Sequence, residues 1–290
     1  MDRPAVVAAV AAWYAAHARP LPWREPDAGP WGVMVSEFML QQTPVVRVLP
    51  VWREWMGRWP TASALAGEPQ GEAVRAWGRL GYPRRAQRLY AAATAIRDEY
   101  AGLVPADAVA LRRLPGVGEY TAAAVASFGF GGRHVVLDTN VRRVLARLEG
   151  GQQFPDASLT QAERARAAAW LPDDAGRAAV WAASSMELGA LVCTTERPNC
   201  PACPVADACA WLADGRPAWD GPPRRGQAYA GTDRQCRGVM LAQLRASDAG
   251  VPAERLLAAW PVDTEQARRA LASLLEDGLA NADGAGIVRL

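Results

Sequence analysis

Apolar residues recur at helical spacing along most of the chain, and strand-like alternation is scarce before the last ten residues. Leu89, Ala93, Ile96 and Tyr100 repeat at i, i+4, i+7 and i+11, which predicts one buried stripe on a helix. Bulky residues recur with helical spacing over residues 6–17 as well, which predicts an amphipathic first helix. Proline and glycine divide these patterns into helices of ordinary length, so the sequence predicts an all-α fold.

Two glycine-containing segments stand between helical patterns in the middle of the chain. The sequence LPGVG at Leu114–Gly118 predicts a tight hairpin, and Gly129–Gly132 predicts a glycine-rich loop. Because Gly116 and Gly118 have no side chains, successive backbone N–H groups can point outward together and bind a phosphate. The same segment also fits a plain turn between two helices.

The C-terminal part of the chain differs in pattern from the rest. Residues 215–231 are rich in Pro, Gly and Arg and predict a linker between a domain at 1–214 and one at 232–290. Four elements are expected in the second domain: helices over 232–245, 252–259 and 263–277, and a hairpin over 279–290. This order predicts a small winged-helix-like domain, an architecture used for both DNA binding and protein contacts.

Charge is distributed unevenly over a nearly neutral chain of 290 residues with a net charge of +2. Residues 75–147 hold 12 Arg against 5 acidic residues, a net of +7, whereas residues 148–220 hold 5 Arg against 10 acidic residues, a net of −5. The basic segment is compatible with a polyanion-binding surface and equally with an ordinary solvated surface. The chain contains no lysine, so no side chain can form a Schiff base.

The apolar stretch at residues 5–16 resembles a signal peptide only superficially. It consists mostly of alanine, and a dozen residues are too few to span a bilayer as a helix. We therefore expect a cytoplasmic protein without a membrane segment.

Four of the five cysteines lie within seventeen residues of one another. Cys193, Cys200, Cys203 and Cys209 form the pattern C-x6-C-x2-C-x5-C. Structural zinc sites usually take their ligands from two close pairs, whereas here one close pair is flanked by single, unequally spaced cysteines. The spacing favours a [4Fe–4S] cluster held by the loop 193–209 over zinc or free thiols.

Two acidic residues are candidates for chemistry. Asp138 precedes a predicted helix that begins near Thr139, where its carboxylate can cap the helix and be held at the positive end of the helix dipole. Glu37 lies within an otherwise apolar helix and is expected to be half buried, which would favour its protonated form at neutral pH. An acid that protonates a leaving base and an ionised partner that stabilises a sugar cation are the groups needed to cleave an N-glycosidic bond.

These motifs together resemble the helix-hairpin-helix DNA glycosylases. Within that superfamily, five ordered segments resemble the MutY adenine glycosylases: LPWR (21–24), SEFMLQQT (36–43), RLGYPRRA (79–86), VLDTNVRRVLAR (136–147) and MELGALVC (186–193). The similarity covers about residues 15–212. It implies the helix-hairpin-helix glycosylase fold, an iron–sulfur cluster, and a nucleoid-associated, monomeric enzyme that acts on double-stranded DNA containing a mispaired adenine.

The resemblance also implies roles for individual residues. Glu37 would protonate the adenine, and Asp138 would stabilise the sugar cation or bond to it transiently, with Tyr120 and Asn140 positioning Asp138 and the attacking species. The remaining candidates would bind substrate and DNA: Trp23, Arg24 and Glu187 would line the adenine pocket, Gln42, Thr43 and Tyr82 would lie beside the opposite base, and Gly116 and Gly118 would contact a phosphate.

Two related classes of enzyme differ from this pattern. The strand-cleaving endonuclease III type uses a lysine where this chain has Tyr120, so the resemblance implies a monofunctional enzyme that leaves the strand intact. The thymine- or uracil-mismatch glycosylases are closer, and Glu37 together with Gln41–Thr43 favours the adenine enzymes over them. A non-catalytic iron–sulfur DNA-binding protein is a further alternative, against which both acidic residues argue.

The chain departs from the MutY pattern at its C-terminus. MutY enzymes usually carry a Nudix-like domain that reads 8-oxoguanine opposite the adenine. The roughly sixty residues after Gly231 are too few for such a domain. The departure puts the preference for 8-oxoguanine over guanine in doubt more than the adenine chemistry.

Overall fold

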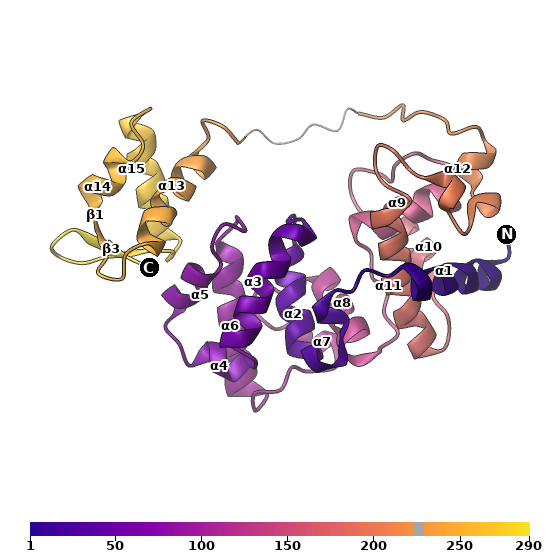
Figure 1. The fold of residues 1–290 in the computed structure, drawn as a ribbon, viewed down its shortest axis with the longest axis horizontal. Coiled ribbons are helices and arrows are strands. Elements are labelled where there is room, and N and C mark those ends of the chain that lie inside the picture. The colour runs from indigo at the N-terminus through magenta and orange to yellow at the C-terminus, as the bar shows by residue number, and fades with distance from the viewer. Residues whose placement is uncertain (223–228) are drawn as a thin grey trace. The chain divides into compact units, whose positions relative to one another are not determined.

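Helices dominate the computed structural model, which describes residues 1–222 and 229–290 (Figure 1). The chain forms two compact units. The first comprises residues 1–34, residues 106–112 and the chain from Val117 up to the undescribed segment, and the second comprises residues 35–105, residues 113–116 and the chain after that segment. The helix α2 (Gly29–Leu40) begins in the first unit and ends in the second.

The first unit is built around a core of valine, leucine and tryptophan side chains. Its elements are α1 (Arg3–His17), η1 (Pro22–Arg24), η2 (Pro26–Ala28), α7 (Ala108–Leu111), α8 (Glu119–Phe130), α9 (Thr139–Leu148), α10 (Gln161–Ala169), α11 (Ala175–Leu191), η3 (Cys200–Ala202), η4 (Ala206–Ala208) and α12 (Ala210–Ala213). Val10 of α1 packs in one cluster with Leu145 of α9 and Leu188 of α11, and Trp170 stacks on Trp181 in the same cluster. The predicted amphipathic first helix is confirmed.

Aspartate side chains begin several helices of the first unit. Asp138 caps α9 by accepting a hydrogen bond from the Val141 N–H, as its position in the sequence predicts. Asp174 caps α11 in the same way through the Arg177 N–H. Each carboxylate satisfies a backbone donor that the first turn of a helix leaves unpaired.

The second unit contains the predicted stripe of apolar residues. Its elements before the undescribed segment are α3 (Val45–Arg58), α4 (Ala62–Ala66), α5 (Gln70–Ala76) and α6 (Arg84–Glu99), together with the end of α2. Leu89, Ala93 and Ile96 of α6 are fully buried, which confirms the stripe, whereas Tyr100 follows the helix end and is half-buried. The aromatic core of this unit is made by Trp55 with Trp59 and Trp77 in edge-to-face contacts.

The C-terminal segment adds three helices and a small sheet to the second unit. They are α13 (Asp233–Arg245), β1 (Val251–Pro252), α14 (Ala253–Ala258), α15 (Thr264–Glu276), β2 (Asn281–Ala282) and β3 (Ile287–Arg289). The antiparallel sheet has the order β1-β3-β2, with Val288 opposite Val251 on one side and Ala282 on the other. The sequence predicted the three helices and the hairpin to within a few residues but missed β1, because two residues are too short to show alternation.

The linker predicted over residues 215–231 falls partly on residues 223–228, which lie outside the described residues. The predicted glycine-rich loop begins later than expected, because Gly129 belongs to α8 and Gly131 caps that helix with φ +70°. None of the helices in the described ranges is long and apolar enough to cross a membrane.

Candidate active site

Asp138 is held from two sides within the first unit. Its Oδ1 accepts a hydrogen bond from the Val141 N–H at 2.7 Å, and its Oδ2 accepts one from Asn140 Nδ2 at 2.6 Å. Burial raises the pKa of this carboxyl, and the hydrogen bonds from Val141 and Asn140 offset part of that increase. The carboxylate therefore has a fixed orientation, as a group that stabilises a developing positive charge requires.

Asn140 is itself held by a buried arginine. Arg143 Nη2 donates to Asn140 Oδ1 at 2.8 Å and to the Gly189 carbonyl at 2.7 Å, and its Nε donates to the Cys193 carbonyl at 2.8 Å. A Cβ at Gly189 would lie 2.7 Å from Asn140 Cβ, so only glycine lets α11 approach Asn140 this closely. A hydrogen-bonded path thus runs from Asp138 through Asn140 and Arg143 to the backbone of Cys193.

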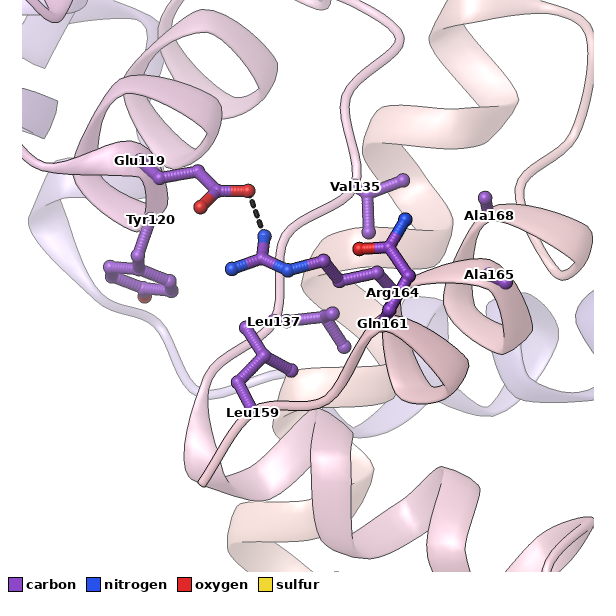
Figure 2. A pocket seen from close by; sticks show the side chains of 9 residues that line it. All are labelled: Glu119, Tyr120, Val135, Leu137, Leu159, Gln161, Arg164, Ala165 and Ala168. Carbon is purple, nitrogen blue, oxygen red and sulfur yellow. Dashed lines mark hydrogen bonds and ion pairs between the residues drawn. The ribbon is translucent and has the colours of Figure 1, made fainter.

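A pocket of about 340 Å³ lies beside Tyr120 in the first unit (Figure 2). It is lined by the start of α8, the segment before Asp138 and α10: Glu119, Tyr120, Val135, Leu137, Leu159, Gln161, Arg164, Ala165 and Ala168. Glu119 and Arg164 form an ion pair at its polar side, and Tyr120 extends away from Val135 and Ala168 in this view. Asp138 follows the lining residue Leu137 directly in the chain.

Glu187, which the sequence placed in the adenine pocket, is fully buried between two arginines. Arg24 Nη2 donates to Glu187 Oε2 at 2.8 Å, and Arg19 donates through Nε to Oε1 at 2.8 Å and through Nη2 to Oε2 at 2.7 Å. Burial alone would raise the pKa of Glu187, but the hydrogen bonds from Arg19 and Arg24 outweigh it and lower the pKa to about 2. The structure therefore joins the predicted residues Arg24 and Glu187, with the buried Trp23 next to Arg24 in η1.

The second unit carries Glu37 and the residues expected beside the opposite base. Glu37 lies on α2 and is 6% exposed, so the acid is more deeply buried than its sequence context indicated. Gln42 and Tyr82 are both exposed and both adopt left-handed backbone conformations, with φ of 55° and 48°. Thr43 is buried, and its hydroxyl bonds the Leu80 carbonyl at 3.3 Å.

The predicted hairpin joins α7 to α8, with its glycines in different environments. Gly116 has φ +79°, and a Cβ there would lie 2.6 Å from Arg88 Cβ and 3.0 Å from Phe38 Cε1 within the second unit. Gly118 precedes α8 as its N-cap, and a Cβ there would meet no atom within 4 Å. Glycine at 116 is thus required by conformation and packing, and Gly118 leaves the start of α8 open to a ligand.

The four clustered cysteines lie in one loop after α11, and all four are half-buried. Burial, together with the neighbouring thiols Cys193, Cys209 and Cys200, raises the pKa of Cys203 to about 11. No group of three or more His, Cys, Asp or Glu side chains in residues 1–222 and 229–290 converges on the position of a single metal ion.

A buried arginine supports the cysteine loop. Arg147 Nη1 lies 3.3 Å from Cys193 Sγ and donates to the Thr194 carbonyl at 2.7 Å, and its Nη2 donates to the Thr195 carbonyl at 3.0 Å. Cys209 Sγ lies 3.5 Å from the Arg147 carbonyl. The fifth cysteine, Cys236, is buried in the core of the C-terminal segment, away from this loop in the sequence.

Sequence reasoning missed the arginines that support these groups: Arg19, Arg85, Arg143 and Arg147. Three of them lie inside the quoted motifs and Arg19 lies two residues before one, but an arginine in a helical pattern resembles any solvated basic residue. The spacing of Asn140 and Arg143, which places them on one face of a helix, was the one signal available.

Comparison with known proteins places these features in a family. Residues 35–169 match the model of the HhH-GPD superfamily of base excision DNA repair proteins. The chain is 52% identical over 268 residues to an adenine DNA glycosylase of Mycobacterium tuberculosis, covering 92% of this chain and 88% of the relative. A human adenine DNA glycosylase is 40% identical over 205 residues, which cover 68% of this chain and 37% of the relative.

Solved structures share the fold. A thermostable thymine-DNA glycosylase superposes with a TM-score of 0.64 at 24% identity, covering 73% of this chain and 97% of that one. Endonuclease III in a non-covalent DNA complex superposes with a TM-score of 0.62 at 23% identity, covering 75% of this chain and all of that one. The chain therefore belongs to the HhH-GPD superfamily of base excision DNA repair proteins and, within it, to the adenine DNA glycosylases.

Proposed function

We propose that this enzyme is a monofunctional glycosylase that hydrolyses the N-glycosidic bond of an adenine mispaired with 8-oxoguanine or guanine. The observation that carries the proposal is the Asp138 carboxylate, which Asn140 and the first turn of α9 hold in one orientation in a member of this family. The bond between the sugar C1′ and the adenine breaks, water supplies the hydroxyl, and the strand stays intact. Release of free adenine from a mispaired duplex, without strand cleavage, tests the proposal.

The two carboxyl groups have different roles in the reaction. Glu37, a buried carboxyl group on α2, is the general acid that protonates the departing adenine. Ionised Asp138 stabilises the positive charge that develops on the sugar. Asn140 and Tyr120 position Asp138 and the attacking water.

The other predicted residues bind the substrate and the surrounding DNA. Trp23 and Arg24 bind the flipped adenine, and the fully buried Glu187 fixes the Arg24 guanidinium in one orientation. Gln42 and Tyr82 enter the duplex beside the opposite base, which offsets part of the energy needed to flip the nucleotide. Gly116 and Gly118 let the hairpin approach a DNA phosphate.

The cysteine loop fits a [4Fe–4S] cluster. The four half-buried cysteines lie in one loop, and their spacing, one close pair flanked by single cysteines, supports a cluster over a structural zinc ion. A cubane separates its four thiolates more widely than one ion does, and the Arg147 guanidinium beside Cys193 compensates thiolate charge. Such a cluster would fix the loop that carries the Cys193 carbonyl and leave hydrolysis to the carboxyl groups.

Spectroscopy tests the cluster directly. Anaerobically purified protein is expected to be brown, with broad absorption near about 400 nm from thiolate-to-iron charge transfer. Cys203→Ser should lose this absorption and most of the bound iron, whereas Cys236→Ser, outside the loop, should retain both. Colourless wild-type protein with stoichiometric zinc would contradict the assignment.

We propose that the enzyme acts as a monomer on double-stranded DNA at the nucleoid. The C-terminal segment 232–290 is proposed to be a winged-helix-like domain, which the order of α13, β1, α14, α15, β2 and β3 supports. The match to the Mycobacterium tuberculosis relative covers 92% of this chain. The uncovered 8% is shorter than the C-terminal segment, so the match includes at least part of that segment. The second helix of a helix-turn-helix pair contacts DNA in proteins of this type, and here that helix is α15.

Exposed arginines on α15 test this role of the C-terminal segment. Replacing Arg268 and Arg269 with alanine should weaken duplex binding only modestly, because two phosphate contacts at most are lost. The loss should be equal for duplexes with adenine opposite guanine and opposite 8-oxoguanine, as measured by equilibrium binding at fixed salt. If the affinity fell only for the duplex with 8-oxoguanine, the segment would recognise that base specifically, which would contradict the proposal.

A further inference from the structure

Arg85, on the first turn of α6, is an arginine whose side chain is 6% exposed and whose partners are neutral. Its Nη1 donates to three carbonyls at the end of α2 and just after it: Phe38 at 3.0 Å, Met39 at 2.9 Å and Gln41 at 2.6 Å. Its Nη2 donates to Thr43 Oγ1 at 3.0 Å. The same Nη2 also donates to the carbonyls of Leu80 at 3.4 Å and Gly81 at 3.0 Å. One guanidinium thus joins the turn after α2 to the turn before α6.

This placement breaks two rules for charged residues. A buried cation is usually paired with a carboxylate, and a cation at a helix N-terminus opposes the helix dipole. Burial lowers the pKa of Arg85 to about 10, so it remains protonated at neutral pH. The last carbonyls of α2, which have no partner within their own helix, supply the compensating negative charge. Departures of this kind occur where a local structure serves a function.

Two of the carbonyls that Arg85 holds directly precede residues with a left-handed backbone conformation, Gln42 and Tyr82. The Gln41 carbonyl belongs to the peptide before Gln42, with φ 55°, and the Gly81 carbonyl belongs to the peptide before Tyr82, with φ 48°. Residues other than glycine rarely adopt this conformation and do so only where their surroundings hold them. The hydroxyl of Thr43 reinforces the link through its bond to the Leu80 carbonyl.

We propose that Arg85 is a positioning residue that fixes Gln42 and Tyr82 as one rigid pair, so that both side chains enter the duplex together. The inference rests on the proposed function, in which these two exposed side chains lie beside the base opposite the adenine. The Arg85 guanidinium touches neither DNA nor the reacting atoms. Arg85 holds both backbone turns in one conformation before DNA binds. Binding therefore does not carry the entropic cost of ordering them.

The test compares two substrates in the full-length protein. Arg85→Lys keeps the charge but lacks the planar fork that reaches both turns, and Arg85→Gln removes the charge. On a duplex with adenine opposite 8-oxoguanine, single-turnover release of adenine should be about 10- to 100-fold slower for both variants, because part of the energy of flipping is no longer offset. On a duplex with adenine opposite an abasic site, which offers no base to wedge beside, the rates should stay close to wild type.

A double-mutant cycle separates positioning from general stability. Arg85→Gln should add little to the loss caused by Tyr82→Ala, because both changes remove the same contribution. Arg97→Gln, at the other end of α6, is the matched control and should leave both rates unchanged. If Arg85→Gln does not fold, Arg85→Lys and Thr43→Val carry the same comparison.

Equal losses of rate on the two substrates, or losses that add fully in the Tyr82→Ala background, would overturn the role of Arg85. Failure of the proposed function is distinguishable, because wild-type protein would then release adenine from neither substrate.

Discussion

Asp138→Asn is expected to abolish adenine excision while leaving duplex binding nearly intact. Loss of a preorganised charge that acts only in the transition state typically reduces the rate by about 100- to 1000-fold or more. Asparagine is also a good N-cap, so the hydrogen bond from Val141 and the start of α9 should survive. The measurement is single-turnover release of adenine, with binding followed on a duplex that carries a non-hydrolysable adenosine analogue.

The matched control is Asp174→Asn. Asp174 caps α11 in the same unit through the Arg177 N–H, just as Asp138 caps α9, but it is exposed, so the control removes a capping charge away from the candidate site. Its excision rate should equal that of the wild type. Turnover of Asp138→Asn near the wild-type rate, or an equal loss in the control, would show that Asp138 serves only to cap its helix.

Glu37→Gln is expected to reduce the excision rate by about 100- to 10,000-fold, because the departing adenine loses its proton donor. The change is nearly isosteric, so α2 should keep its packing around Phe38. Rates should be measured at a saturating enzyme concentration, which separates the chemical step from binding.

Glu54→Gln on α3 is the control for Glu37, because it removes an exposed carboxylate from the same unit. It should leave the rate unchanged. If Glu37→Gln retained substantial activity, the proton would have to come from another group, and the assignment of the two acids would be wrong.

Local patterns in the sequence predicted the parts of the fold that depend on local physics. The periodicity at Leu89, Ala93 and Ile96 predicted a buried helix face. The position of Asp138 before a helical pattern predicted that its side chain caps the helix. The short strand β1 escaped prediction because its two residues pair with β3 residues that lie 35 and 37 positions further along the chain.

The supporting arginines were not predictable for a related reason. Arg85 and Arg143 donate to backbone carbonyls that the fold brings together. Every residue has a backbone carbonyl, so the sequence does not indicate which carbonyls an arginine will bond. Glu187 shows the same limit, since neither its full burial nor its pairing with Arg19 follows from a glutamate on a helical pattern. Motif similarity located the residues expected to act on the substrate and Asn140, which holds Asp138, whereas the supporting arginines became visible only in three dimensions.

The most direct test of the central claim is base release from four duplexes that carry A opposite 8-oxoguanine, A opposite guanine, T opposite guanine and U opposite guanine. We expect adenine to be released from the first two duplexes, with the strand left intact until alkali is added, and thymine and uracil not to be released. Release of thymine or uracil in place of adenine, or direct strand cleavage by the enzyme, would contradict the central claim.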